Sequence, residues 1–315
     1  MFTKTLPFDA DELGKMKTAW WYYTVEMPDG DLVRGTYADH LPFAPRVMQR
    51  RVKFDGVDCL DIGSAEGLLP ILCKKNGANR VVATDNLEYG FYDKLLFLQK
   101  AHGVELDFAP IDRAENIHEL ASRYPQGFDF INLSGVLYHV LSPLDAIASA
   151  RALLKPNGLM LLSTINVFRP GCFMEFNDHG RLQHHYNIFW YVSCGFFEYA
   201  MRMCSLEPID VEFISPGEKE EYGYLSVLAR GTENPAAVGN DDYPSLARNF
   251  SKEFDLLRGI ELPRSEIETR NLSDDFVPHP ETNQMDLWAT VNTKQGVSYS
   301  TRTKDSRVFL LSDVE

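Results

Sequence analysis

The sequence predicts an α/β protein with a parallel sheet covered by helices on both faces, and three observations support this fold class. The chain has 315 residues, 44% of them hydrophobic, which is enough for one large core with accessory segments. Between residues 57 and 165, short apolar, β-branched runs alternate with segments of helical periodicity. The first run ends in a glycine-rich turn. Alternating strands and helices indicate parallel strands that are buried on both faces.

The predicted elements follow one another at regular intervals. Strands are expected at Val57–Ile62, Arg80–Thr84, Val104–Ile111, Phe128–Leu133 and Leu159–Ile165. Helices are expected at Leu68–Lys75, Phe91–His102, Asn116–Tyr124 and Pro143–Leu154. The last helix has Pro143 in its first turn, where the missing N–H costs little, and the turn Lys155-Pro-Asn-Gly158 closes it.

Past Thr164 the regular alternation ends, and the rest of the chain is predicted from weaker patterns. We expect a loop at Asn166–Gly180, an aromatic-rich helix at His184–Leu206, and a closing strand pair at Ile209–Ile214 and Tyr222–Ala229. From Gly231 the composition turns polar, which predicts a linker or hinge. The tail contains a helical candidate and three β-like runs: Ser245–Gly259, Leu287–Val291, Val297–Thr301 and Arg307–Leu311. We therefore divide the chain into an N-terminal lid or accessory segment (1–45), a main domain (46–230) and a C-terminal α+β accessory extension (231–315).

Charge and cysteine content narrow the classes of partner and compartment. A formal net charge of −14 argues against a partner held mainly through phosphates, because such binding depends on clustered Lys and Arg. Five cysteines without CxxC spacing indicate free thiols instead of a disulfide framework or a zinc cage. No apolar run approaches the length of a signal peptide or a membrane span. We expect a cytoplasmic protein without a nucleic-acid or membrane partner.

The stretch Asp61-Ile-Gly-Ser-Ala-Glu-Gly67 follows the first predicted strand and differs from a dinucleotide-binding loop. That loop needs G-x-G-x-x-G, so that a pyrophosphate can lie against a helix amino terminus. Here Ala65 takes the middle position, and Glu66 would put negative charge where a phosphate should lie. The second strand ends at Asp85, where a ribose diol is held in such sheets. Together these residues predict a nucleoside without phosphates, although Asp85 alone is equally well explained as a turn or N-cap residue.

With these residues, Asp112 and the stretch Phe128-Asp-Phe-Ile-Asn-Leu-Ser-Gly-Val-Leu-Tyr-His139 make the chain resemble a class I S-adenosylmethionine-dependent methyltransferase from about Val57 to Arg230. Ser134–His139 and Trp21–Gly30 are similar to the branch that contains the tRNA wobble-uridine carboxymethyltransferase and its small-molecule relatives. The resemblance implies a Rossmann-like, doubly wound, mostly parallel seven-stranded sheet. It also implies that residues 46–230 form the methyltransferase domain, with S-adenosyl-L-methionine as cofactor.

The resemblance assigns a cofactor role to ten residues: Asp61, Gly63, Ser64, Gly67, Asp85, Asn86, Asp112, Arg113, Ser134 and Tyr138. Asp61, Gly63 and Ser64 would border the methionine part, and Gly67 would let the first helix pack closely. Asp85 with Asn86 would hold the ribose, and Asp112 with Arg113 would flank the adenine. Ser134 and Tyr138 would line the sulfonium side. Ala65 departs from the family, which commonly has Gly there, and asks that a methyl group fit into the loop.

Several residues are candidates for the acceptor side. His139, just past the fourth strand, is the candidate general base, since its ordinary pKa is about 6.5. It could instead cap a turn or pack beneath the cofactor, and an acidic hydroxyl would need no base. Trp20-Trp-Tyr-Tyr23 could close over a planar acceptor or seal the edge of the sheet. The residues assigned to the acceptor are Trp21, Tyr22, Tyr23, Tyr186 and Trp190. We expect no metal, because His179, His184 and His185 lack a ligand spacing.

The favoured function is methyl transfer to an O, N or C atom of a small-molecule acceptor of a biosynthetic pathway. The enzymatic alternative is a tRNA wobble-uridine-modifying (carboxy)methyltransferase-like enzyme, which predicts a basic face. Residues 231–315 hold 9 Lys and Arg against 15 Asp and Glu, so this tail is not such a face. The third hypothesis is a non-catalytic binding module of the same fold, with homo-oligomer contacts through the tail from Tyr243.

Overall fold

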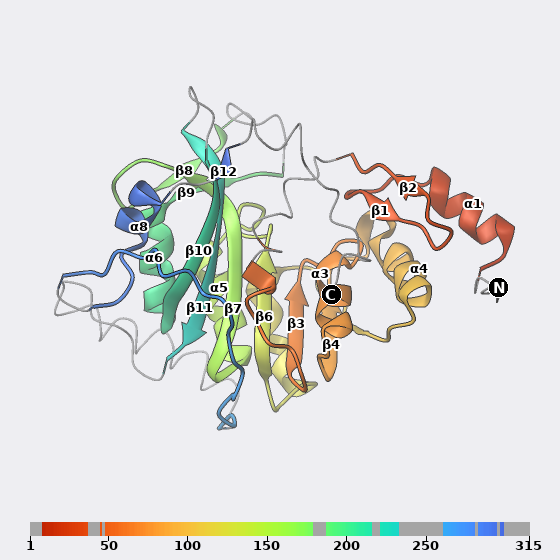
Figure 1. Cartoon of the computed structure of the whole chain (residues 1–315), viewed down its shortest axis with the longest axis horizontal. Coiled ribbons are helices and arrows are strands. Elements are labelled where there is room, and N and C mark those ends of the chain that lie inside the picture. The colour runs from red at the N-terminus through yellow and green to blue at the C-terminus, as the bar shows by residue number, and fades with distance from the viewer. Residues whose placement is uncertain are drawn as a thin grey trace.

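A single large sheet forms the centre of the computed structural model (Figure 1). The structure describes residues 8–36, 45, 48–178, 187–215, 221–232, 261–280, 283–294 and 297–298. Seven principal strands lie in the order β10-β11-β7-β6-β3-β4-β5. Their bounds are β3 Asp58–Ile62, β4 Arg80–Thr84, β5 Asp107–Phe108, β6 Phe128–Ser134, β7 Leu154–Val167, β10 Leu206–Ser215 and β11 Tyr222–Gly231. Three short strands join this sheet, which are β8 Met174–Phe176, β9 Trp190–Ser193 and β12 Val297–Ser298.

The strand directions confirm the predicted mostly parallel, seven-stranded α/β fold. β3 pairs in parallel with both β4 and β6, β4 with β5, and β6 with β7. β11 is antiparallel to both β7 and β10. The chain fills one side of β3 with β4 and β5 and then returns to place β6 on the other side. Ligands in open parallel sheets bind at such a reversal, beyond the carboxyl ends of the strands.

Helices cover both faces because successive strand residues point to opposite sides of the sheet. On one face, Leu60, Ile62 and Val82 share a cluster with η2 (Ala114–Ser122), α5 (Pro143–Leu153) and α6 (Cys194–Met203). On the other face, Ala83 packs with α3 (Leu68–Lys75) and α4 (Phe91–His102). A short 3₁₀ turn, η1 (Glu88–Gly90), leads into α4.

Local signals explain the ends of these helices. The side chain of Ser142 caps α5 by accepting from the backbone N–H of Asp145 at 3.4 Å, and Pro143 fills the first turn. Gly103 ends α4 in the left-handed conformation, with φ +62°. The predicted bounds of α3, α4 and β4 agree with the structure.

Three predicted elements differ from the structure. The predicted helix His184–Leu206 is wrong at Trp190–Ser193, which pair with β7 and β8, and α6 begins only after Ser193, whose Oγ accepts from the N–H of Phe196. The predicted loop Asn166–Gly180 contains β8. The β-like run Leu287–Val291 belongs to a helix, α8 (Leu287–Thr293), because the Asp286 side chain accepts from the N–H of Ala289 and the buried residues have helical spacing.

Two further predicted elements are shorter or of another helix type in the structure. The predicted strand Val104–Ile111 forms regular pairing only at Asp107–Phe108, since β5 is the edge of the sheet next to β4. The predicted helix Asn116–Tyr124 is the 3₁₀ helix η2. The expected helix Ser245–Gly259 and the run Arg307–Leu311 lie outside the described residues.

The N-terminal segment packs beside α3 and α4. It consists of α1 (Ala10–Thr18) and a hairpin of β1 (Val25–Glu26) and β2 (Leu32–Val33), which Figure 1 shows next to α4. Trp21 joins the core cluster of Leu68 and Leu95 and is 1% exposed. The segment is therefore fixed to the central sheet and its helices by apolar packing.

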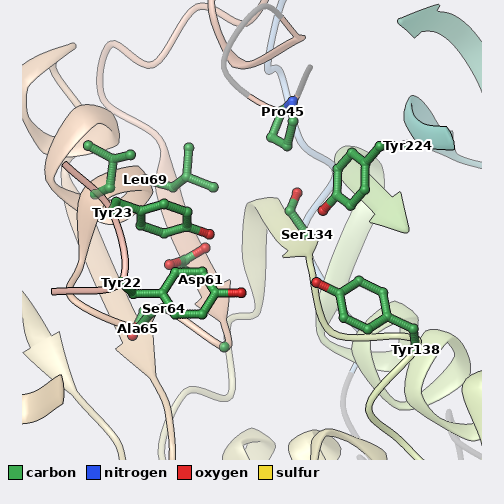
Figure 2. Close-up of a pocket in the computed structure, with 12 residues that line it drawn as sticks. Tyr22, Tyr23, Pro45, Asp61, Ser64, Ala65, Leu69, Ser134, Tyr138 and Tyr224 are labelled. Carbon is green, nitrogen blue, oxygen red and sulfur yellow. The ribbon is translucent and has the colours of Figure 1, made fainter. Parts of the chain in front are cut away.

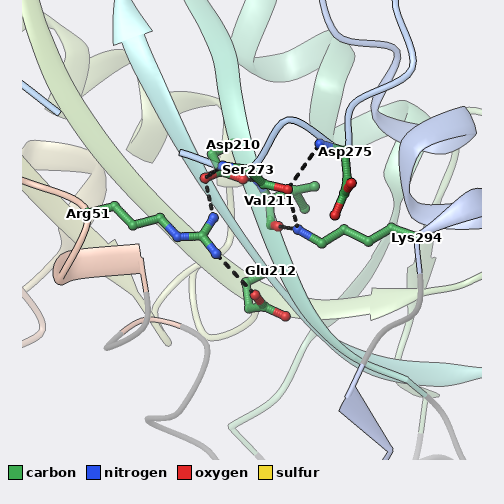
Figure 3. Close-up of polar contacts among 7 residues, drawn as sticks. All are labelled: Arg51, Asp210, Val211, Glu212, Ser273, Asp275 and Lys294. Atoms are coloured by element: carbon green, nitrogen blue, oxygen red, sulfur yellow. Dashed lines mark hydrogen bonds and ion pairs between the residues drawn. The ribbon is translucent and has the colours of Figure 1, made fainter. Parts of the chain in front are cut away.

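The C-terminal extension returns to the sheet through buried polar contacts. Figure 3 shows the guanidinium group of Arg51 between the carboxylates of Asp210 and Glu212 on β10. The N–H of Ser273 donates to Asp210 at 3.0 Å, and Lys294 Nζ donates to the carbonyl of Val211 at 2.8 Å. These contacts tie Ser273 and Lys294 to β10. Within the described residues, no helix has the length and apolar character that a bilayer crossing requires.

Candidate active site

A pocket lies at the carboxyl ends of β3 and β6, at the reversal of strand order (Figure 2). Figure 2 shows Tyr22, Tyr23, Asp61, Ser64 and Ala65 on one wall, facing Ser134, Tyr138 and Tyr224 on the other. Pro45, Gly63, Leu68 and Leu69 complete the lining. The first wall combines the glycine-rich loop, Asp61–Gly67, with the N-terminal aromatic segment, Trp20–Tyr23. The second combines the end of β6 with β11.

The glycine-rich loop has a backbone that requires glycine at two positions. The N–H groups of Gly63 and Ser64 both donate to the carbonyl of Thr84 at 2.9 Å. Gly63 has φ +74°, and a Cβ there would lie 2.5 Å from Val136 Cγ2. Gly67 has φ +90°, and its Cβ would lie 2.1 Å from Leu95 Cδ1. Left-handed backbone and close neighbours thus exclude larger residues at both positions.

The sequence predicted only that the methyl group of Ala65 must fit into the loop. In the structure, Ala65 also adopts a left-handed backbone conformation. Its φ is +45°, in the left-handed region that disfavours residues with a Cβ by roughly 1–2 kcal/mol. Its N–H donates to Asp85 Oδ2 at 2.7 Å, which holds the loop to the end of β4. The neighbouring carboxylate therefore supports this strained conformation.

Asp85 acts as a turn residue in the structure while keeping oxygen lone pairs that a ligand could use. Oδ2 accepts from Ala65, and Oδ1 accepts from the N–H of Asn86 at 2.8 Å. Burial raises the pKa of Asp85 above its ordinary value. Each carboxylate oxygen has a second lone pair, so these bonds are compatible with a further hydrogen bond from a hydroxyl group. Asp85 and Asn86 lie behind the loop and do not line the pocket, and neither do Asp112 and Arg113, which are exposed.

Asp61 is the buried acid of the pocket. It is 2% exposed, and its Oδ1 accepts a hydrogen bond from the side-chain amide of Asn132 on β6. Burial raises the pKa of Asp61 to about 7, against the lowering effect of the Asn132 hydrogen bond. The carboxylate is thus poised to ionise fully beside a cationic ligand.

The sequence predicted that the charge of Glu66 would face the ligand, and the structure corrects this. Glu66 instead contacts the N-terminal aromatic segment, Trp20-Trp-Tyr-Tyr23. Its side chain is 1% exposed and does not line the pocket, so its charge is not presented to a bound ligand. Oε1 accepts from the backbone N–H of Tyr22 and lies 3.9 Å from Lys94 Nζ. Burial raises the pKa of Glu66 to about 7. Glu66 therefore joins the loop to the aromatic segment, and no spacing in the sequence indicated this contact.

Tyrosines supply most of the remaining surface. The rings of Tyr22 and Tyr23 meet edge to face with centroids 4.7 Å apart. A Cβ on Gly135 would lie 3.5 Å from the hydroxyl oxygens of both Tyr138 and Tyr224, so these two hydroxyl groups approach the same point. Burial raises the pKa of Tyr23 and Tyr224 well above the ordinary value, which keeps both protonated. Sequence analysis missed Tyr224, because β11 is remote from the loop in the chain.

Two residues assigned to the acceptor lie elsewhere. Trp21 is buried, and its Nε1 donates to the carbonyl of Met16 at 2.8 Å, so it belongs to the core and not to the pocket wall. Trp190 starts β9, and its Nε1 donates to the carbonyl of Leu141 at 3.2 Å. Neither residue lines the pocket. Tyr186, and with it His179, His184 and His185, lies outside the described residues.

His139 is half-buried beside the second wall without lining the pocket. Its Nδ1 lies 2.6 Å from the carbonyl oxygen of Asn187. Because a carbonyl only accepts, Nδ1 carries the hydrogen, and Nε2 is the basic nitrogen of the neutral ring. Its ring also contacts that of Tyr138, with centroids 4.1 Å apart.

A comparison of the chain with known protein families finds a match. Residues 34–193, half of the chain, match the family model described as a methyltransferase domain. The chain belongs to the methyltransferase-domain family. This membership confirms the resemblance to class I S-adenosylmethionine-dependent methyltransferases, enzymes whose cofactor is S-adenosyl-L-methionine.

Two curated relatives of the methyltransferase match part of its chain. A ubiquinone biosynthesis O-methyltransferase of Histophilus somni (strain 2336) is 29% identical over 162 residues, which are 51% of this chain and 64% of that protein. One from Xylella fastidiosa (strain M23) is 32% identical over 119 residues, 38% of this chain and 46% of that protein. The chain thus spans less than two thirds of the length of these curated relatives.

A solved structure shares the methyltransferase fold. The N-terminal domain of EvdMO1, crystallised in the presence of SAH and D-fucose, has a TM-score of 0.51 and 18% identity. The match covers 71% of this chain and 97% of that one. At this identity the comparison supports the fold alone.

The pocket of the methyltransferase contains a group that fits a polar ligand. Ser64 is 6% exposed, and its Oγ has no hydrogen-bond partner among the described residues. Buried hydroxyl groups normally have a partner, so Ser64 is suited to a polar atom of a bound cofactor. Within the described ranges, no group of three or more His, Cys, Asp or Glu is placed to hold a metal ion.

Proposed function

We propose that this methyltransferase transfers the methyl group of S-adenosyl-L-methionine to an oxygen atom of a small, hydroxyl-bearing biosynthetic acceptor. The observation that carries the proposal is the charge of the pocket. Its described lining has one carboxylate, Asp61, four tyrosines and neither Lys nor Arg. A cofactor with a sulfonium and an α-ammonium group but no phosphate matches this lining. The names of the curated relatives, O-methyltransferases of ubiquinone biosynthesis, support oxygen as the accepting atom.

The proposed cofactor site follows the glycine-rich loop. Asp61, Gly63 and Ser64 would border the methionine part, with Ser64 Oγ gaining the partner that it lacks in the described residues. Asp85 and Asn86 would take the ribose at the end of β4. Asp112 and Arg113, which are exposed and lie outside the pocket lining, would border the adenine. Gly67 would act indirectly, by letting α3 and α4 pack closely behind the loop.

In the proposed chemistry the protein aligns the acceptor with the methyl group and excludes water. No side chain needs to form a covalent bond with either substrate. S-adenosyl-L-methionine supplies a methyl group that is already activated by the positive sulfur. Tyr22 and Tyr23 would cover the site and exclude water, which strengthens the electrostatic interactions inside. Ser134 and Tyr138 would line the sulfonium side of the cofactor, and their hydroxyl groups, with that of Tyr224, would orient the acceptor there. Protonated Tyr224 can donate a hydrogen bond but is not a base, since burial raises its pKa.

His139 is the proposed general base for acceptors whose hydroxyl group must lose a proton. The carbonyl of Asn187 holds Nδ1 as the donor, which directs the basic lone pair to Nε2. The net charge of −14 argues against tRNA as the acceptor, because binding through phosphates depends on clustered Lys and Arg.

Ligand-dependent melting and product analysis test the proposal. S-adenosylhomocysteine at about 100 times its dissociation constant should stabilise the protein by about 2.7 kcal/mol, and NAD should not. Asp61→Asn should lose this stabilisation, whereas the control Glu119→Ala, at an exposed position on η2, should keep it. Stabilisation by NAD alone would contradict the cofactor assignment.

The acceptor class is tested separately. Hydroxylated aromatic compounds and matched amines are incubated with enzyme and S-adenosyl-L-methionine, and products are identified by mass spectrometry. The proposal expects a mass increase of one methyl group on oxygen. Transfer to the amines alone would overturn the oxygen assignment while leaving the cofactor assignment intact.

A further inference from the structure

A row of hydrogen-bonded side chains crosses the sheet and ends at the pocket. Asn132 Nδ2 on β6 donates to Asp61 Oδ1 on β3, and Ser134 Oγ donates to Asn132 Oδ1 at 2.6 Å. Ser134 Oγ lies 3.1 Å from Ser163 Oγ on β7, which lies 2.7 Å from Ser226 Oγ on β11. Four neighbouring strands thus contribute to one network.

Strand register produces this row. Asp61 is the register partner of Asn132, Ser134 of Ser163, and Ser163 of Ser226. Asn132 and Ser134 are two residues apart on β6, so they point to the same face. Four of these side chains are nearly inaccessible, with Asp61 2%, Asn132 3%, and Ser163 and Ser226 both 0% exposed.

The hydrogens in the network have one consistent direction. Asp61 accepts when it is ionised, so the amide NH₂ of Asn132 faces it and the amide oxygen faces Ser134. Ser134 has a single hydroxyl hydrogen, and Asn132 Oδ1 is its nearer acceptor. Ser163 can then donate to Ser134, and Ser226 to Ser163. Every donor points toward Asp61, and aligned hydrogen bonds of this kind strengthen one another.

The two pocket residues of the network lie on opposite walls. Asp61 belongs to the proposed cofactor wall, and Ser134 belongs to the proposed acceptor wall (Figure 2). Asn132 does not line the pocket, yet it bonds to both. A buried amide at this position is stabilising only when both its donor and its acceptor are paired, as they are here.

We propose that Asn132 is a positioning residue that fixes the Asp61 carboxylate and the Ser134 hydroxyl group relative to each other, so that cofactor and acceptor are held in one alignment. This inference rests on the proposed function. Asn132 acts through its two neighbours and does not touch the ligand.

The pH dependence of ligand binding separates this role from simple packing. Burial and the nearby Asp85 raise the pKa of Asp61, and the Asn132 hydrogen bond lowers it. Tyr23, on the N-terminal segment, also faces Asp61 and stays protonated. Removing the Asn132 donor should therefore raise the pKa of Asp61 further, and a ligand that needs the ionised form would bind only at higher pH.

The experiment measures the affinity for S-adenosylhomocysteine by calorimetry from pH 5.5 to pH 9, with the full chain and three variants. Asn132→Leu keeps the approximate volume without polar atoms, and Asn132→Ala removes both hydrogen bonds without adding bulk or charge. Ser226→Ala is the matched control, because it removes the far end of the same network. For both Asn132 variants we expect the pH midpoint of binding to rise by about one unit and the affinity at pH 7 to fall about tenfold. The control should shift by less than about 0.5 of a unit.

Asp61→Asn distinguishes failure of the inference from failure of the proposed function. If wild type does not bind S-adenosylhomocysteine, or Asp61→Asn binds it equally well, the proposed cofactor site is wrong and the inference falls with it. If Asp61→Asn loses binding while a folded Asn132 variant keeps the wild-type midpoint, only the role of Asn132 is overturned. Asn132→Ala decides the question if Asn132→Leu does not fold.

Discussion

Replacing Gly67 by Ala should destabilise the methyltransferase by about 2–5 kcal/mol. Gly67 precedes α3 in a left-handed conformation, with φ 90° and ψ 22°. An Ala there carries a backbone penalty of roughly 1–2 kcal/mol. Its Cβ would lie 2.1 Å from Leu95 Cδ1, and Leu95 is 0% exposed, so the clash falls inside the core. Overpacking of this kind costs about 1–3 kcal/mol.

Gly90→Ala is a closely matched control for this prediction. Gly90 precedes α4 in a similar left-handed conformation, with φ 65° and ψ 24°, and a Cβ there would meet nothing within 4 Å. It should show the backbone penalty alone, about 1–2 kcal/mol. The difference between the two variants therefore isolates the contact between the glycine-rich loop and α4.

Urea unfolding at constant pH measures both variants, provided that the slope of the free energy against urea is unchanged. Repeating Gly67→Ala in a Leu95→Ala background removes the clashing methyl group. The penalty of Gly67→Ala should then fall by about 1–3 kcal/mol, the overpacking part. Equal losses for Gly67→Ala and Gly90→Ala, or no coupling to Leu95, would refute the close packing of α4 against the loop.

Two further predictions concern the ionisable groups of the site. Asp61 and Glu66 have folded pKa values of about 7, above their ordinary values, so their contribution to stability is complete below about pH 4 and is lost as pH rises through 7. The ligand-free protein should thus resist urea better at pH 5.5 than at pH 8, by about 2 kcal/mol per group, and Asp61→Asn with Glu66→Gln should flatten that difference; an unaltered pH profile would show that neither group is responsible. His139→Ala should keep its affinity for S-adenosylhomocysteine while turnover, followed by release of that product, falls by a factor on the order of 100; unchanged turnover would remove His139 from the mechanism.

Local patterns predicted the elements that are longest and most regular. The bounds of α3 and α4 follow from helical spacing and from Gly67 and Gly103 at their ends. The run Trp190–Ser193 was assigned to a helix because a short apolar run has no periodicity that separates strand from helix. It became β9 because β7 and β8 offer it backbone partners, which are contributed by distant segments of the chain.

The sequence by itself determined the α/β alternation, the glycine-rich loop and the two acids at strand ends, because each depends on residues that are near one another in the chain. It also determined the net charge of −14, which argues against a partner held mainly through phosphates. The tertiary structure decided which groups meet: Glu66 with the backbone of Tyr22, Asn132 with Asp61, and Tyr224 with Tyr138 on one wall of the pocket. The physical reason is that strand order and register set these contacts, and both result from the packing of the whole sheet.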